Sequence, residues 1–163
     1  MTMNKIIAIL ICIFGIQTMS AQTTLSINFL KSNKWILLED GVEKGKKDTT
    51  VISFDNKKMY TSTHYHFFHP QKKEIIDTTL KVDCTYYLTD VITGNYDATK
   101  VGKATNGKYI TFHNVTSKYE DPNGYSTFEV TRKSNSEIVL TLRSFSPDTF
   151  DTIGRELILI KKQ

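Results

Sequence analysis

The feature that most constrains the fold of this chain is an alternation of apolar and polar residues with a period of two. It recurs in short runs rich in Val, Ile, Thr, Tyr and Phe, the pattern typical of β-strands with one buried face. Eight such runs occur, at Lys34–Glu39, Thr50–Asp55, Lys58–Phe68, Leu80–Thr89, Lys108–Val115, Tyr125–Arg132, Glu137–Ser144 and Arg155–Lys161. Helical periodicity is confined to Leu25–Leu30, where we expect a turn or two of helix.

The segments between the runs are short and rich in residues that favour turns. They contain Asp40-Gly41, Asp55-Asn56, Thr93-Gly94-Asn95, Asn106-Gly107, Pro122-Asn123-Gly124 and Ser134-Asn135. Parallel neighbours would need crossovers of about a dozen residues or more, so short turns favour an antiparallel meander. We therefore predict an all-β, eight-stranded antiparallel up-and-down barrel preceded by a short helical turn, with a β-sandwich as the alternative.

The N-terminus has the layout of a secretory signal peptide. Lys5 precedes the apolar run Ile6–Ile16, and small residues follow at Ser20-Ala21. This run is too short to cross a bilayer, which needs about 20 apolar residues. We expect residues 1–21 to be removed, residues 22–163 to form a single barrel domain, and the protein to be periplasmic or secreted.

Composition narrows the classes of partner. Without Lys5 and Cys12 the mature chain has 20 basic and 17 acidic side chains, and its lysines are scattered in pairs. This small positive excess is typical of a solvated surface, so we expect neither nucleic-acid binding nor a membrane span. Cys84 is then the single cysteine, which excludes an internal disulfide, and we expect it to be a buried thiol.

Two histidines form the most chemically suggestive pair. In a strand, His64 and His66 point to the same face with imidazoles about 6–7 Å apart, a spacing that suits one metal ion if a third ligand is supplied. The alternation places both on the outer face, however, where solvated side chains are the simpler interpretation. We keep a metal site at His64 and His66 as the weaker alternative and expect no cofactor.

Familiar catalytic signatures are missing from the sequence. It contains no Gly-x-Ser-x-Gly elbow, His-Glu-x-x-His helix, Gly-rich phosphate loop or Cys-x-x-Cys pair. We therefore expect a protein that is not an enzyme.

A resemblance to a known family follows from several features together. An apolar N-terminal turn leads into Asn33-Lys34-Trp35, about eight strands follow, and the last apolar strand has a basic residue, Arg155 or Lys161. With Leu30–Leu38 and Tyr86-Tyr87-Leu88, this layout resembles the lipocalins, and more closely the lipocalin-like domains of secreted bacterial proteins, which are calycin-like β-barrels. The resemblance implies a barrel that Trp35 closes at one end against a cationic side chain, a role we assign to Arg155.

The interior face of the predicted barrel offers a ligand cavity. We expect this cavity to be lined by Met59, Tyr65, Phe67, Tyr86, Leu88, Phe112, Phe128 and Leu140. The first functional hypothesis is a monomeric, exported protein that binds a small apolar or amphipathic ligand. The alternative is a protein-interaction module, such as an inhibitor, an immunity factor or an envelope assembly protein. The volume left inside the barrel distinguishes the two, because eight strands can enclose either a filled interior or a small ligand.

Overall fold

The computed structural model describes residues 23–40, 47–113, 124–147 and 151–163. The predicted signal peptide lies outside these residues. The strands are β1 Leu25–Ser26, β2 Trp35–Asp40, β3 Lys47–Phe54, β4 Lys58–His69, β5 Glu74–Thr89, β6 Asn106–Gly107, β7 Tyr109–His113, β8 Tyr125–Lys133, β9 Glu137–Phe145 and β10 Glu156–Lys161, with helix α2 at Ile27–Lys31 and the 3-10 turn η1 at Ala98–Lys100. No helix among these residues is long and apolar enough to cross a membrane.

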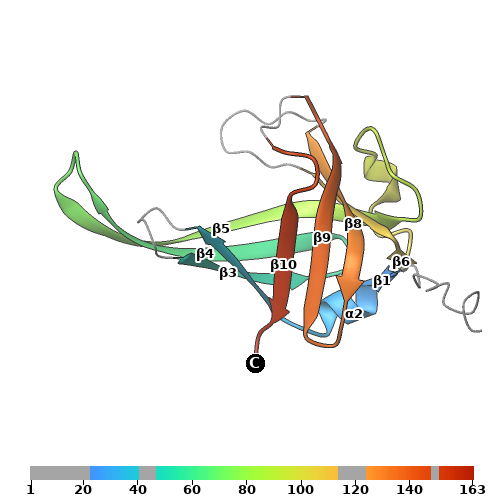
Figure 1. Ribbon diagram of the computed structural model, residues 1–163, viewed down its shortest axis with the longest axis horizontal. Coiled ribbons are helices and arrows are strands. Elements are labelled where there is room, and N and C mark those ends of the chain that lie inside the picture. The colour runs from blue at the N-terminus through green and yellow to red at the C-terminus, as the bar shows by residue number, and fades with distance from the viewer. Residues whose placement is uncertain (1–22, 41–46, 114–123, 148–150) are drawn as a thin grey trace, which may run out of the picture.

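Eight of the strands close into an antiparallel barrel in the order β10-β2-β3-β4-β5-β7-β8-β9 (Figure 1). Neighbours in the barrel are neighbours in the chain, apart from the closing pair β10–β2 and the short β6 that intervenes before β7. Tight turns join β3 to β4, β4 to β5 and β8 to β9, whereas a longer segment with η1 and β6 joins β5 to β7. All neighbours are antiparallel, and the fold is the predicted up-and-down barrel rather than a sandwich. It is consistent with a calycin-like architecture.

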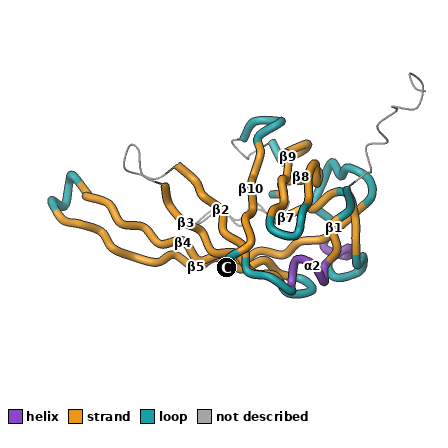
Figure 2. The backbone as a smooth tube through the Cα atoms, turned by 60° about the horizontal axis from the view of Figure 1, so that its bottom comes forward, coloured by secondary structure: helices purple, strands orange, loops and turns teal. Residues whose placement is uncertain are grey.

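Helix α2 packs against one end of the barrel (Figure 2). Ser26 caps its first turn by accepting a hydrogen bond from the Phe29 amide, and Ile27 and Leu30 are buried. The last carbonyls of a helix lack partners within it. Here Asn33 donates its side-chain amide to the Phe29 carbonyl, and the Trp35 indole N–H donates to the Leu30 carbonyl at 3.1 Å. The predicted helical turn is confirmed, and its end is held by the residues that begin the first barrel strand.

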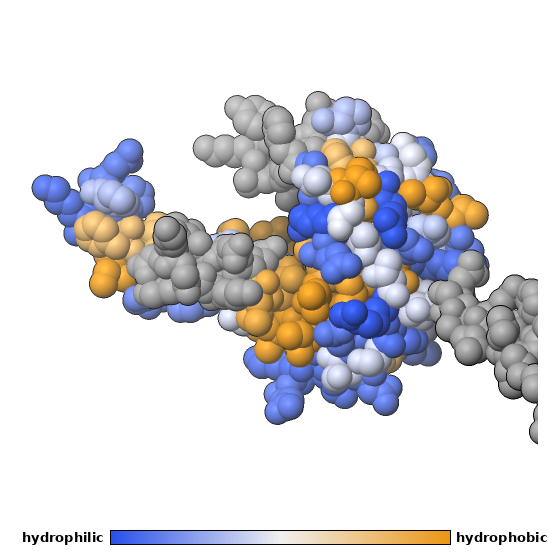
Figure 3. Space-filling model, in the orientation of Figure 1, coloured by the Kyte–Doolittle hydropathy of each residue, from blue (hydrophilic) through white to orange (hydrophobic). Residues whose placement is uncertain are grey.

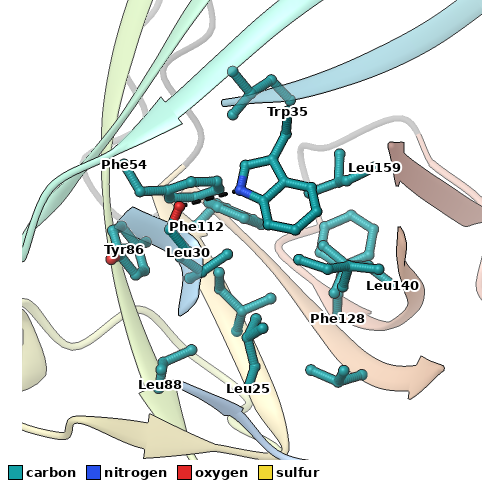
Figure 4. Packing of buried hydrophobic residues seen from close by; sticks show 14 of the residues in the cluster. Leu25, Leu30, Trp35, Phe54, Tyr86, Leu88, Phe112, Phe128, Leu140 and Leu159 are labelled. Carbon is teal, nitrogen blue, oxygen red and sulfur yellow. Dashed lines mark hydrogen bonds between the residues drawn. The ribbon is translucent and has the colours of Figure 1, made fainter. Parts of the chain in front are cut away.

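The half of the barrel next to α2 is filled by side chains (Figure 4). Trp35, Leu30, Tyr86 and Leu88 are almost completely buried, and Phe54 packs edge-on against Tyr86 with ring centroids 5.4 Å apart. Edge-to-face aromatic contacts of this kind add stability beyond the area that they bury. This end of the barrel is therefore a packed core.

The segment between β5 and β6 covers part of the outer face of the barrel. The Tyr87 hydroxyl donates to the Asn95 carbonyl, and its ring packs against that of Tyr96. Nearby, the hydroxyls of Thr93, Thr111 and Thr127 form a buried triangle with sides of 2.9 to 3.1 Å. Tyr87 is thus buried beneath this loop, although the alternation assigns it to the outer face of β5.

Strands β4 and β5 extend beyond the barrel as a two-stranded arm (Figures 1 and 2). The pairing of β3 with β4 runs as far as Thr49–His64, whereas β4 and β5 stay paired out to His69–Glu74. Strand β5 therefore begins six residues before the predicted start at Leu80. The added residues, 74–79, lie outside the hydrophobic core, and only Ile75 and Ile76 among them are apolar, so the sequence pattern did not reveal them as a strand.

Candidate functional site

The half of the barrel away from α2 contains a cavity of about 400 Å³. All eight barrel strands contribute to its wall, and most of the lining side chains are apolar, including Leu37, Ile52, Val82, Leu157 and Leu159. The volume falls within the range of small-molecule sites, about 300–1,000 Å³. The alternation of each strand points these side chains inward, so the cavity is a product of the barrel itself.

An ion pair lies at the open end of this cavity. The Arg155 guanidinium donates two hydrogen bonds of 2.6 Å, from Nε and one Nη, to the two carboxylate oxygens of Asp151. It also lies 5.9 Å from the centre of the Phe128 ring. The hydrogen bonds from Arg155 hold the pKa of the Asp151 carboxyl below its ordinary value. The two hydrogen bonds make this a bidentate ion pair, whose opposite charges cancel, so the pair adds no net charge to the cavity lining.

Hydroxyl groups add a second kind of polar contact. Thr50 and Thr63, on β3 and β4, hydrogen-bond to each other at 2.7 Å, and Thr61 donates to the Val82 carbonyl. Together with Ser126, these side chains line the cavity. A ligand that enters therefore meets apolar side chains together with hydroxyls that can exchange hydrogen bonds with a polar group.

Cys84 lines the same cavity and is buried. Burial raises the pKa of its thiol to about 12, so it is a protonated, poorly nucleophilic group at neutral pH. This placement agrees with the buried thiol expected from the sequence.

The structure brings together four of the eight residues predicted to line a ligand cavity. Met59, Phe112, Phe128 and Leu140 all lie in the cavity wall. The rings of Phe112 and Phe128 pack edge-on, with centroids 5.9 Å apart. Phe112, Phe128 and Leu140 come from the adjacent strands β7, β8 and β9, and Met59 comes from β4.

The other four predicted lining residues lie elsewhere. Tyr86 and Leu88 point inward but belong to the packed half next to α2, where the Tyr86 hydroxyl donates to the Asp55 carbonyl at 2.7 Å. Tyr65 and Phe67 continue the inward face of β4 but lie on the part of the strand that projects as the arm. The alternation identified the correct face for all four, but it contains no information on where along the barrel the cavity ends.

Trp35 and Arg155 lie at opposite ends of the barrel. Trp35 is fully buried beside α2, and its register partner on β10 is Lys161. Arg155 directly precedes the other end of β10 and contacts Asp151. At the α2 end, the Lys133 ammonium lies 5.0 Å from the centre of the Phe29 ring, which packs against Trp35.

His64 and His66 lie on the outer face of β4, as the alternation indicated. Both approach the carboxylate of Asp77 on β5, at 3.4 and 3.3 Å, and all three side chains are more than half exposed. Within the described residues, no three His, Cys, Asp or Glu side chains form a group able to hold a metal ion.

Sequence reasoning missed the polar part of the site. Thr61 and Thr63 follow Met59 at every second position and therefore share its inward face, so the period of two did contain a signal for them. Asp151 falls in a segment without strand periodicity, and its pairing with Arg155 depends on how that segment approaches β10.

No family model, no curated protein and no solved structure matches this chain.

Proposed function

We propose that this protein is an exported, non-catalytic carrier or receptor that binds a small amphipathic molecule inside its barrel. The observation that supports it is the cavity of about 400 Å³, which is lined by side chains from every barrel strand. Burying apolar surface contributes about 25 cal/mol per Å², so an apolar ligand body of modest size gains substantial affinity in such a site. A filled barrel would instead have favoured the protein-interaction alternative.

The lining also indicates the chemistry of the ligand. An anionic head group would have to displace Asp151 from Arg155, two groups that already neutralise each other. A neutral hydroxyl, amide or carbonyl can hydrogen-bond to the Thr50–Thr63 pair or to Ser126 without separating any charges. The ligand class that fits best is therefore an apolar molecule with a neutral polar group.

A binding role also agrees with the state of the charged pair. A carboxylate whose pKa is lowered by a bidentate arginine is a weak base and is not available as an acid at neutral pH. We therefore assign Asp151 and Arg155 to positioning a ligand at the cavity mouth rather than to proton transfer.

A fluorescence titration with N-phenylnaphthylamine, a neutral apolar probe, tests this proposal. We expect saturable binding, loss of binding in Leu157→Trp, whose added ring occupies the cavity, and unchanged binding in Ile158→Trp. Ile158 is adjacent in the sequence but is 39% exposed on the outer face, which makes it a matched control. Absence of saturable binding by the wild-type protein, or equal binding by both variants, would contradict a ligand site in the barrel.

A further inference from the structure

Along the arm, one edge of β5 has no partner among the described strands. On one side β5 pairs with β4 from Glu74 to Thr85, and on the other it pairs with β7 only from Tyr86 to Thr89. No described strand pairs with Glu74–Thr85 on the β7 side. An edge of this length presents unpaired main-chain N–H and C=O groups that can accept another strand.

The orientation of these groups follows from the neighbouring pairing. The Tyr86 amide donates to the Lys57 carbonyl on the β4 side at 3.0 Å. Main-chain groups alternate in direction along a strand, so the odd-numbered residues from Ile75 to Asp83 present theirs to the open edge. Strand β5 contains no proline, so every one of these amides can donate.

The arm also exposes large apolar side chains. Ile75 is 63% exposed, Leu80 53% and Phe68 52%. Figure 3 shows apolar surface on the arm, away from the barrel wall. An isolated two-stranded ribbon is marginally stable in water, and exposed apolar groups on an edge strand favour association. A further strand beside β5 would cover part of this surface.

The charges of β5 are arranged symmetrically about Thr79. Asp77 precedes it by two residues and Lys81 follows it by two. In an antiparallel pair of β5 strands with Thr79 opposite Thr79, each Asp77 therefore lies opposite Lys81 of the other chain, and two ion pairs form. In the described part of the chain, Lys81 has no salt-bridge partner of its own, while Asp77 contacts only the two histidines on β4.

The opposite face of the same register pairs mostly apolar side chains. Ile76 lies opposite Val82 and Thr78 opposite Leu80, each pair occurring twice by symmetry. Such cross-strand pairs are the units that stabilise a sheet. About ten main-chain hydrogen bonds would join the two strands between Ile75 and Asp83, because each hydrogen-bonded residue pair exchanges two.

Neighbouring registers are less favourable. Centring the pairing on Asp77 or on Lys81 places like charges opposite each other, and centring it on Leu80 places Asp77 opposite Asp83. Centring it on Val82 pairs Lys81 with Asp83, but the ladder then runs into residues that already pair with β7. Centring it on Thr78 forms no ion pair between residues of β5. The register about Thr79 alone combines opposite charges with a full-length ladder.

We propose that two copies of this chain associate through their β5 edges, antiparallel and centred on Thr79, to form a symmetric homodimer. The two arms then form a four-stranded sheet, with the tip of each arm beside the barrel of the other chain. This assembly differs from the monomer expected from the sequence, because the open edge becomes visible only in the folded barrel. It does not depend on the proposed ligand.

Sedimentation velocity of the protein produced from the full sequence tests the association. We expect twice the mass of one chain for the wild type. The dissociation constant of the dimer should rise about tenfold or more in Asp77→Lys and in Lys81→Asp, because each change turns two attractive pairs into repulsive ones. The double variant Asp77→Lys/Lys81→Asp restores opposite charges and should restore the dimer. Lys103→Asp, an exposed change of the same charge away from the arm, serves as the control.

A disulfide tests the register directly. Thr78 and Leu80 of opposite chains would form non-hydrogen-bonded pairs with Cα atoms about 4.5 Å apart, within the range that a disulfide bridges. With Cys12 and Cys84 replaced by Ala, the variant Thr78→Cys/Leu80→Cys should oxidise to a covalent dimer, whereas Thr78→Cys alone should not. A monomer at every concentration tested, or a dimer that resists both charge changes, would overturn the proposal.

Discussion

Replacing Trp35 with Phe tests whether the indole holds helix α2 against the end of the barrel. The side chain is fully buried, and its N–H donates to the Leu30 carbonyl, one of the helix carbonyls without an intrahelical partner. Phenylalanine keeps an aromatic ring at this position but cannot donate this hydrogen bond. The change therefore separates the specific role of tryptophan from the general need for a large apolar group.

The expected loss can be worked from these contacts. A buried carbonyl left without a partner costs about 1–3 kcal/mol. The phenyl ring also lacks two indole carbons, each contributing about 0.8 kcal/mol when buried. The free energy of unfolding should therefore fall by about 3 kcal/mol, which lowers the urea midpoint by about 1.5 M for a slope of about 2 kcal/mol per M.

Urea unfolding followed by far-UV circular dichroism measures this loss, because Trp35 is the chain's single tryptophan and its fluorescence disappears in the variant. Leu38→Ala is the control, since Leu38 lies on the same strand but is 45% exposed. We expect it to cost less than about 1 kcal/mol. If Trp35→Phe costs no more than Leu38→Ala, the indole contact does not anchor α2.

Three further outcomes are expected. The Cys84 thiol, whose pKa burial raises to about 12, should react with Ellman's reagent at pH 8 only after unfolding in urea; fast labelling of the native protein would show that the cavity wall opens. Hydrogen bonds from Arg155 lower the pKa of Asp151 in the folded protein. The stability that Asp151 contributes should therefore be fully present above its unfolded-state pKa, near 3.8, and should be lost as the pH falls through the lower folded-state pKa. Urea unfolding of wild type and Asp151→Asn should therefore differ at pH 6 and converge toward pH 2, and a difference that is constant with pH would refute this assignment. Gly107→Ala should destabilise the fold by about 2 kcal/mol in the same unfolding assay, because its Cβ would lie 2.6 Å from main-chain atoms of Thr89; an unchanged midpoint would show that these strands separate freely.

Much of the barrel could be predicted from the period of two. The alternation around Ile52, Leu88 and Leu140 assigned these side chains to the interior, where the structure buries them. Turn residues such as Asp55-Asn56 marked where the chain reverses. These are local properties, since the direction of a side chain depends on its position along its own strand.

The expected strand Lys58–Phe68 covers nearly all of the β4 half of the arm, but the β5 half was not predictable in the same way. Ile76 and Thr78 follow the alternation of β5, but the polar residues around them give the same pattern as a loop. Where β4 and β5 leave the barrel as an arm depends on where the pairing of β3 with β4 stops, which a different segment of the chain sets. The signal peptide, export and ligand binding remain predictions.

By itself, the sequence determined the number and order of the barrel strands, their inward faces and the helical turn that precedes them. Each of these follows from local periodicity and turn chemistry. Tertiary structure alone decided which inward residues enclose the cavity, that Asp151 meets Arg155 at its mouth, and that one edge of β5 has no partner among the described strands. Those features depend on the distances between segments that are far apart in the chain. Strand tilt and closure of the barrel set these distances, and no local sequence pattern encodes them.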